Sequence, residues 1–215
     1  GFGKSDQPYG IYSYDILADD IKKVLSVLEI DNCIMVGFSS GAAVAVRYLT
    51  LHLQARVNKL VLLSGTVPVF VRQKDYTYGI AVQEVESMIS LCNKDRAQLI
   101  LNFCKLLFSD AEKTNAARMS WLHTIGMQAS PNATQNFLIS MKDADFSNEL
   151  AQLTIPIAIL QGINDKISSV EMARQLNSLI PNSQLTLFEN SGHALLLEEI
   201  EKCNQALIDF ANIAL

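Results

Sequence analysis

The chain has 215 residues, 49% of them hydrophobic, and a formal net charge of −5. This length is sufficient for one domain with a substantial core. The sequence has no cluster of lysine and arginine and no apolar run approaching the roughly 18 residues that cross a bilayer, so we expect neither a nucleic acid nor a membrane as a partner.

The chain begins with a loop rich in glycine and then alternates between helical and strand patterns. Apolar residues recur at helical spacing over Tyr14–Leu28. Short apolar runs at 33–38 and 59–64 predict two strands, the first of them buried on both faces. The stretch Gly41–His52 between these runs is typical of a helix.

Between positions 68 and 148 the alternation stops. This segment of about 80 residues is much longer than an ordinary connection. It contains no strand pattern, so we predict that it forms a helical cap inserted between two strands. The helical patterns lie at Met88–Leu91, Ala97–Leu107 and Thr114–Met127, with a further helix start at Pro131.

Strand patterns resume at 157–161 and 184–189, with helical patterns at 169–180 and 197–213. Strands that alternate with helices predict a parallel sheet covered on both faces. The fold class is therefore α/β. We expect its core to consist of residues 1–67 and 149–215, with residues 68–148 as the helical cap.

The four cysteines are scattered, and no pair of them has C-x-x-C spacing. The chain has three histidines, and we expect no metal site. Free thiols are typical of a reducing compartment, so we predict a cytoplasmic protein whose buried or half-buried thiols are Cys33, Cys92, Cys104 and Cys203.

The sequence Gly37-Phe38-Ser39-Ser40-Gly41 matches G-x-S-x-G and lies where the first predicted strand gives way to a helix. In such a sharp turn the serine is strained, and the glycines leave room for the crossing backbone. The hydroxyl then stands above the sheet near a helix N-terminus, which favours developing negative charge. A serine that merely caps the helix would not explain both glycines. We predict that Ser39 is a nucleophile.

A serine nucleophile needs a base, and three histidines are available. His193 lies in the loop after the last predicted strand, at the edge where parallel sheets bind ligands, and we predict that it is the base. We interpret His52 as a residue at the surface or at the end of a helix. His123, beside Trp121 in the cap, is interpreted as a packed or hydrogen-bonded polar residue.

The acid that orients His193 is predicted to be Asp165, in the loop after the preceding strand. An isolated aspartate there would form a turn hydrogen bond. However, the order Ser39, Asp165, His193, each after its own strand, is that of the α/β-hydrolases. The alternatives Asp143 and Asp145 lie where the cap returns to the sheet, and we interpret them as solvated or capping residues.

The segments GFGKSDQPYGIYSYDILADDI, VGFSSGAAVAVRYL, RVNKLVLLSGTVP and ENSGHALLLEE resemble the α/β-hydrolase superfamily. The resemblance is strongest to the cofactor-free bacterial haloperoxidase/arylesterase group. It covers nearly the whole chain and implies the α/β-hydrolase fold with this triad. In the superfamily, strands and a His-Gly loop that completes the oxyanion hole precede GFGKSD, and we expect them to be missing from this chain. The N–H of Ser40 is then one oxyanion donor, at a position where the group usually has methionine.

The resulting hypothesis is a serine hydrolase that cleaves small carboxylic esters through an acyl-enzyme and requires no cofactor. The resemblance also allows a perhydrolase side activity, in which peroxide replaces water. The alternative is a hydrolase-fold ligand receptor or signalling protein with little turnover. A homodimer through a sheet edge or the cap is compatible with the sequence. Apolar cap residues could line an acyl or aryl pocket, although packing explains them equally: Phe103, Phe108, Trp121 and Met127.

Overall fold

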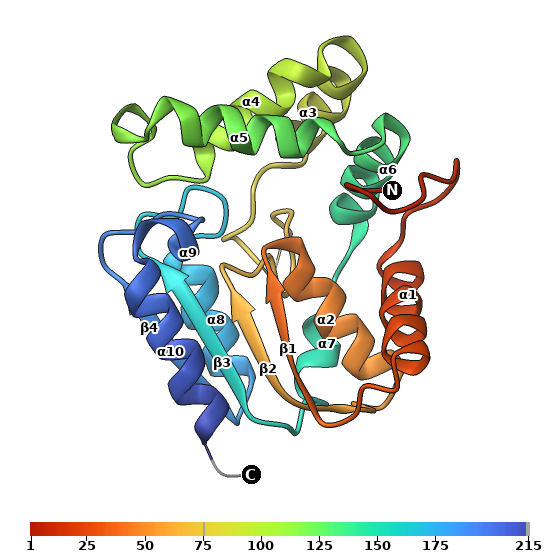
Figure 1. Ribbon diagram of the computed structural model, residues 1–215, viewed down its shortest axis with the longest axis vertical. Helices are drawn as coiled ribbons and strands as arrows, with labels where there is room; N and C mark the ends of the chain where they lie inside the picture. The colour runs from red at the N-terminus through yellow and green to blue at the C-terminus, as the bar shows by residue number, and fades with distance from the viewer. Residues whose placement is uncertain (75, 214–215) are drawn as a thin grey trace.

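The computed structural model describes residues 1–74 and 76–213, and its centre is a parallel sheet with the strand order β1-β2-β3-β4 (Figure 1). Each strand coincides with a run predicted from the sequence, with slightly different ends. Because the strands are parallel, the loops that follow them meet at one edge of the sheet. The strands are β1 (Cys33–Phe38), β2 (Val57–Leu63), β3 (Ile157–Gly162) and β4 (Ser183–Phe188).

Helices cover both faces of the sheet: α1 (Tyr14–Val27), α2 (Ser40–Leu51), α7 (Ser147–Leu150), α8 (Val170–Leu179), α9 (Leu195–Glu198) and α10 (Ile200–Asn212). Along β2, Leu60 and Leu62 belong to a core shared with α1, α2 and α8. Val61 and Leu63 belong to a second core shared with α10. This alternation is the consequence of the two-residue period of a strand.

The helix α2 is fixed from two sides. Its small residues, among them the fully buried Ala42, let it pack closely on the sheet. Nε of Arg47 lies 2.5 Å from Oδ1 of Asp15 in α1, and its Nη1 lies 2.6 Å from Oε1 of Glu149 in α7. The hydrogen bond to Asp15 is the main cause of a raised pKa at Arg47. These contacts hold the helix that follows Ser39.

The segment between β2 and β3 is helical, as predicted, and Figure 1 shows α3, α4 and α5 beyond the carboxyl ends of the strands. Several of these helices begin at side-chain caps: Asp95, Asn115 and Ser130 accept backbone N–H groups of the first turn. The division of the chain at residues 68 and 148 stays a prediction. The helices are α3 (Val82–Lys94), α4 (Arg96–Leu106), α5 (Ala116–Met127) and α6 (Pro131–Asp143), with a short 3₁₀ turn at Ala111–Lys113.

Two predictions about the elements are wrong. The strand β1 is not buried on both faces, since Ile34 is 38% and Val36 49% exposed. The reason is that β1 is an edge strand within the described residues, and the core under α10 draws on β2, β3 and β4. The last helix is not continuous from 197 to 213, because Glu199 adopts φ −117° and ψ 59° and separates α9 from α10.

The cysteines are free thiols, as expected, with Cys33 half-buried and the other three buried. Burial raises the pKa of each of these thiols. Of the helices in residues 1–74 and 76–213, none combines the length and the apolar character that crossing a membrane requires.

Candidate active site

Ser39 lies in the sharp turn between β1 and α2 and has a strained backbone, with φ 55° and ψ −123°. Such conformations cost a non-glycine residue about 1–3 kcal/mol and need support from their surroundings. The N–H of Ser39 donates to the carbonyl of Leu63 at 2.9 Å, and its carbonyl accepts from the N–H of Thr66 at 3.3 Å. Its side chain makes no capping hydrogen bond to α2, so the simple capping role does not apply.

The two glycines of the motif differ. A Cβ atom on Gly37 would lie 2.6 Å from both the Cα of Ala42 and the carbonyl oxygen of Gly41, so this position requires glycine. A Cβ atom on Gly41 would meet nothing within 4 Å. The prediction that both glycines make room for crossing backbone is therefore wrong for Gly41.

Ser40 is the first residue of α2. The first N–H groups of a helix have no acceptor within the helix, and they carry the positive end of its dipole. The N–H of Ser40 is therefore available to an oxygen atom placed above the turn at Ser39.

The carboxylate of Asp165 follows β3 and is held by four donors. Its Oδ1 accepts the N–H groups of Ile167 at 2.8 Å and Ser168 at 2.9 Å, as an aspartate in a turn does. Its Oδ2 accepts Nε2 of Gln161 at 2.9 Å and lies 2.8 Å from Nδ1 of His193. The side chain thus serves the turn and the histidine at once.

His193 is buried in the loop after β4. An ionised carboxylate can only accept, so Nδ1 of His193 carries the proton that is donated to Asp165, and Nε2 is left as an acceptor. Nε2 is buried and has no hydrogen-bond partner among the described residues. The imidazole packs on the ring of Phe38, the residue immediately before Ser39, with ring centroids 5.0 Å apart.

The loops that carry Asp165 and His193 are in close contact. A Cβ atom on Gly162 would collide with the carbonyl oxygens of Ser191 and Gly192. The N–H of Asn164 also donates to the carbonyl of Ser191 at 3.0 Å. Glycine at position 162 therefore allows the two loops to approach each other.

Two polar residues of this region were not found from the sequence. Nε2 of Gln161 donates to Asp165 and to the carbonyl of Ser168, at 2.9 and 2.8 Å. Glu198 accepts the N–H of Gly192 at 2.6 Å. In the sequence, Gln161 is the polar residue that ends the apolar run IAILQ, and Glu198 is the first acid after the apolar run ALLL that follows His193. These two positions are the only sign of either residue that the sequence gives.

The other histidines and the alternative acids lie elsewhere. Nε2 of His52, at the end of α2, lies 3.1 Å from Oδ1 of Asp19. Nε2 of His123 donates to the carbonyl of Ala97 in α4 at 3.1 Å. The carboxylate of Asp145 accepts the N–H of Ser147 at the start of α7, and Asp143 ends α6.

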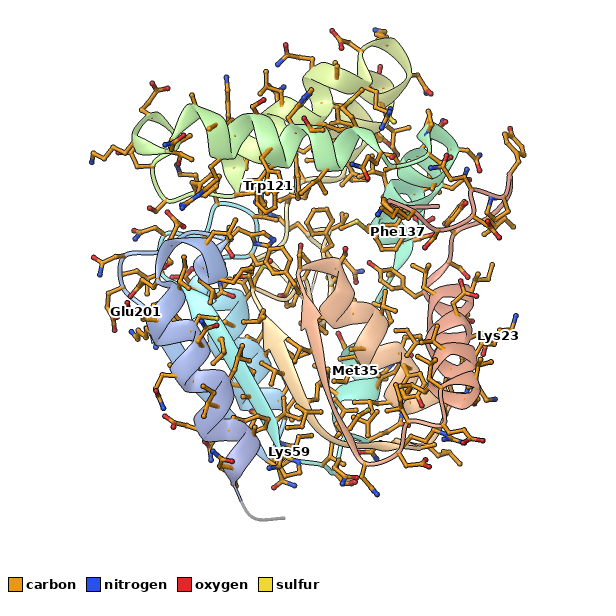
Figure 2. The ribbon with its side chains drawn as sticks, viewed as in Figure 1. Lys23, Met35, Lys59, Trp121, Phe137 and Glu201 are labelled. Carbon is orange, nitrogen blue, oxygen red and sulfur yellow. The ribbon has the colours of Figure 1, made fainter. Side chains whose placement is uncertain are left out.

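The cap residues predicted for the pocket differ in exposure. Trp121 is 54% exposed, and Figure 2 shows it on the side of α5 that faces the sheet. Met127 is half-buried and Phe103 is exposed, whereas Phe108 is buried in a cluster with Leu107 and Ala194. In the described part of the chain, no three His, Cys, Asp or Glu side chains are grouped as metal ligands.

A sequence profile of the alpha/beta hydrolase fold matches residues 1–200. The chain belongs to the α/β-hydrolase family. The AB hydrolase superfamily protein YisY of Bacillus subtilis is 37% identical over 212 residues, which cover 99% of this chain and 78% of YisY.

Two solved structures are similar to this chain over almost its whole length. The esterase EaEST from Exiguobacterium antarcticum is 31% identical with a TM-score of 0.96, and the bromoperoxidase from Bacillus anthracis is 28% identical with a TM-score of 0.95. Each match covers 99% of this chain and 79% of the solved chain. The α/β-hydrolase fold predicted from the sequence is confirmed, and the bromoperoxidase agrees with the resemblance to haloperoxidases.

Proposed function

We propose that this α/β-hydrolase is a serine hydrolase that cleaves small carboxylic esters through an acyl-enzyme. The observation that supports this most is the buried imidazole of His193, whose Nδ1 is bound to Asp165 while Nε2 has no hydrogen-bond partner among the described residues. This is the arrangement of a base that is oriented and ready to accept a proton. The likeness to an esterase, EaEST, supports the ester substrate.

In the first half of the reaction, Oγ of Ser39 attacks the ester carbonyl while its proton passes to Nε2 of His193. Asp165 stabilises the imidazolium through Nδ1. The N–H of Ser40 and the N-terminus of α2 stabilise the negative charge on the carbonyl oxygen. When the tetrahedral intermediate collapses, the ester bond breaks, and the leaving alcohol takes the proton from His193.

In the second half, water attacks the acyl group on Ser39. His193 takes a proton from this water and returns it to Oγ of Ser39 as the carboxylic acid is released. Hydrogen peroxide can take the place of water, and the product is then a peracid. The likeness to a bromoperoxidase supports this side activity.

In this proposal Trp121 and Met127, both of α5, contact the substrate from the side of the cap. Trp121 offers an apolar ring that remains more than half exposed while it faces the sheet (Figure 2). Such a surface fits an apolar acyl or aryl group. A substitution at Trp121 should therefore change the preference among ester chain lengths.

The test combines a fluorophosphonate probe with p-nitrophenyl acetate and butyrate as substrates, and uses Ser39→Ala as the control variant. We expect stoichiometric labelling at Ser39 by mass spectrometry, turnover of the esters, and loss of both in the control. Labelling without turnover would favour the alternative, a hydrolase-fold receptor or signalling protein. Absence of labelling would overturn the role of Ser39.

A further inference from the structure

The residues on either side of His193 are held by hydrogen bonds from their backbone N–H groups. The N–H of Gly192 donates to Oε2 of Glu198 at 2.6 Å, and the N–H of Ala194 donates to the carbonyl of Leu107 at 2.7 Å. The bond from Ala194 holds the peptide that follows His193, and the bond from Gly192 holds the backbone one residue before it. Its orientation therefore depends on groups outside its own loop.

The second oxygen of Glu198 connects this loop to the segment that follows α4. Oε1 of Glu198 accepts the N–H of Ser109 at 2.9 Å and its hydroxyl at 2.6 Å. One half-buried carboxylate thus takes three donors, two from Ser109 and one from Gly192. Hydrogen bonds to an ionised acceptor are shorter and stronger than those between neutral groups. The Glu198 carboxylate can therefore hold the histidine loop firmly against the segment at Ser109.

Further contacts hold the same segment in place. Nζ of Lys166, one residue after Asp165, donates to the carbonyl of Ser109 at 3.0 Å. A Cβ atom on Gly192 would lie 2.6 Å from the nitrogen of Ser109, so the two backbones are in direct contact. Residues 107–109 therefore touch both loops that carry the acid and the base.

We propose that Glu198 is a positioning residue, which holds Gly192 and thereby aims Nε2 of His193 at Ser39. It acts through the peptide at Gly192 and couples the histidine loop to residues 107–109. This inference rests on the proposed function of His193 as the base. A displacement of about 1 Å in a catalytic group can cost on the order of 100-fold in rate. Loss of the hydrogen bonds from Gly192 and Ser109 to Glu198 should therefore lower kcat.

The kinetic test uses two substitutions at this position. Glu198→Gln keeps one acceptor oxygen and cannot satisfy Ser109 and Gly192 together, whereas Glu198→Ala satisfies neither. We expect kcat to fall on the order of 10- to 100-fold in Glu198→Gln and further in Glu198→Ala, with KM within about twofold of wild type. Glu201→Gln, at an exposed carboxylate of α10 labelled in Figure 2, makes the same charge change and should keep wild-type kinetics.

The second readout is the proton NMR resonance of Nδ1–H of His193, which reports its hydrogen bond to Asp165 and requires no turnover. We expect it to shift or broaden in Glu198→Gln and to be unchanged in Glu201→Gln, at equal folded fractions by circular dichroism. The proposal is overturned by a Glu198→Gln kcat equal to that of Glu201→Gln, or by a retained wild-type resonance. If the wild-type protein cleaves no ester, the proposed function fails, and the resonance still decides the role of Glu198. If Glu198→Ala does not fold, Glu198→Gln alone decides.

Discussion

The ring of Phe38 packs against the imidazole of His193, with centroids 5.0 Å apart and an angle of 46° between the planes. Phe38 is the last residue of β1, whereas His193 follows β4, so the histidine loop reaches across the ends of β2 and β3. This contact places the proposed base beside the turn that carries Ser39. The role of His193 as the base can be tested by replacing each of the three histidines in turn and comparing the activities.

Replacement of His193 with alanine should lower kcat for p-nitrophenyl acetate by about 10³-fold or more, because Ser39 loses its proton acceptor. The matched controls are His52→Ala and His123→Ala, since these rings contact Asp19 and the carbonyl of Ala97 instead. Both controls should keep most of the activity. Similar losses in all three variants would contradict the assignment.

Gly37→Ala should destabilise the protein by about 1–3 kcal/mol, because its Cβ would meet the backbone of α2 at 2.6 Å. Gly41→Ala is the counterpart with open space, and it should be stabilised by about 0.5–1 kcal/mol from better helix propensity. Urea unfolding followed by circular dichroism measures both changes. An equal loss of stability in the two variants would refute the difference found between the glycines.

Lys59→Met should lower the free energy of unfolding by about 2–3 kcal/mol. Nζ of Lys59 is buried at the end of α10 and donates to the carbonyls of Phe210 at 3.2 Å and Ala211 at 2.7 Å (Figure 2). The substitution removes a cation from the negative end of that helix and takes a donor from the carbonyl of Ala211, while the carbonyl of Phe210 keeps the N–H of Ile213. Lys23→Met, at an exposed lysine of α1, should have almost no effect in the same urea titration.

The thiols should react slowly with iodoacetamide in the native protein at neutral pH. Burial raises the pKa of Cys92, Cys104 and Cys203, so the reactive thiolate is scarce as well as inaccessible. Cys33 is half-buried and has a raised pKa too, so it should be labelled first, at a rate that increases with pH. Mass spectrometry of labelled peptides measures the order, and rapid native labelling of the three buried thiols would contradict it.

The candidate residues that the sequence predicts are those whose position follows from strand order. Ser39, Asp165 and His193 each lie in a loop after a strand, and parallel pairing brings such loops to one edge. Gln161 and Glu198 were not predicted, because their roles depend on hydrogen bonds between segments that meet only in the folded chain.

The errors in the predicted fold have the same origin. An apolar run such as CIMVGF predicts a strand, but its burial depends on which neighbours flank it, and Ile34 and Val36 have none over their side of the sheet among the described residues. Likewise, glycine at position 41 fits the motif, but only the path of the neighbouring backbone shows that a side chain would have space there.

The close approach of Gly162 to the histidine loop limits which residues this position can accept. A Cβ atom there would collide with the carbonyl oxygens of Ser191 and Gly192, so any larger residue would have to push the two loops apart. Among natural variants of this chain, glycine should therefore be retained at position 162 wherever the hydrogen bond between Asp165 and His193 is kept.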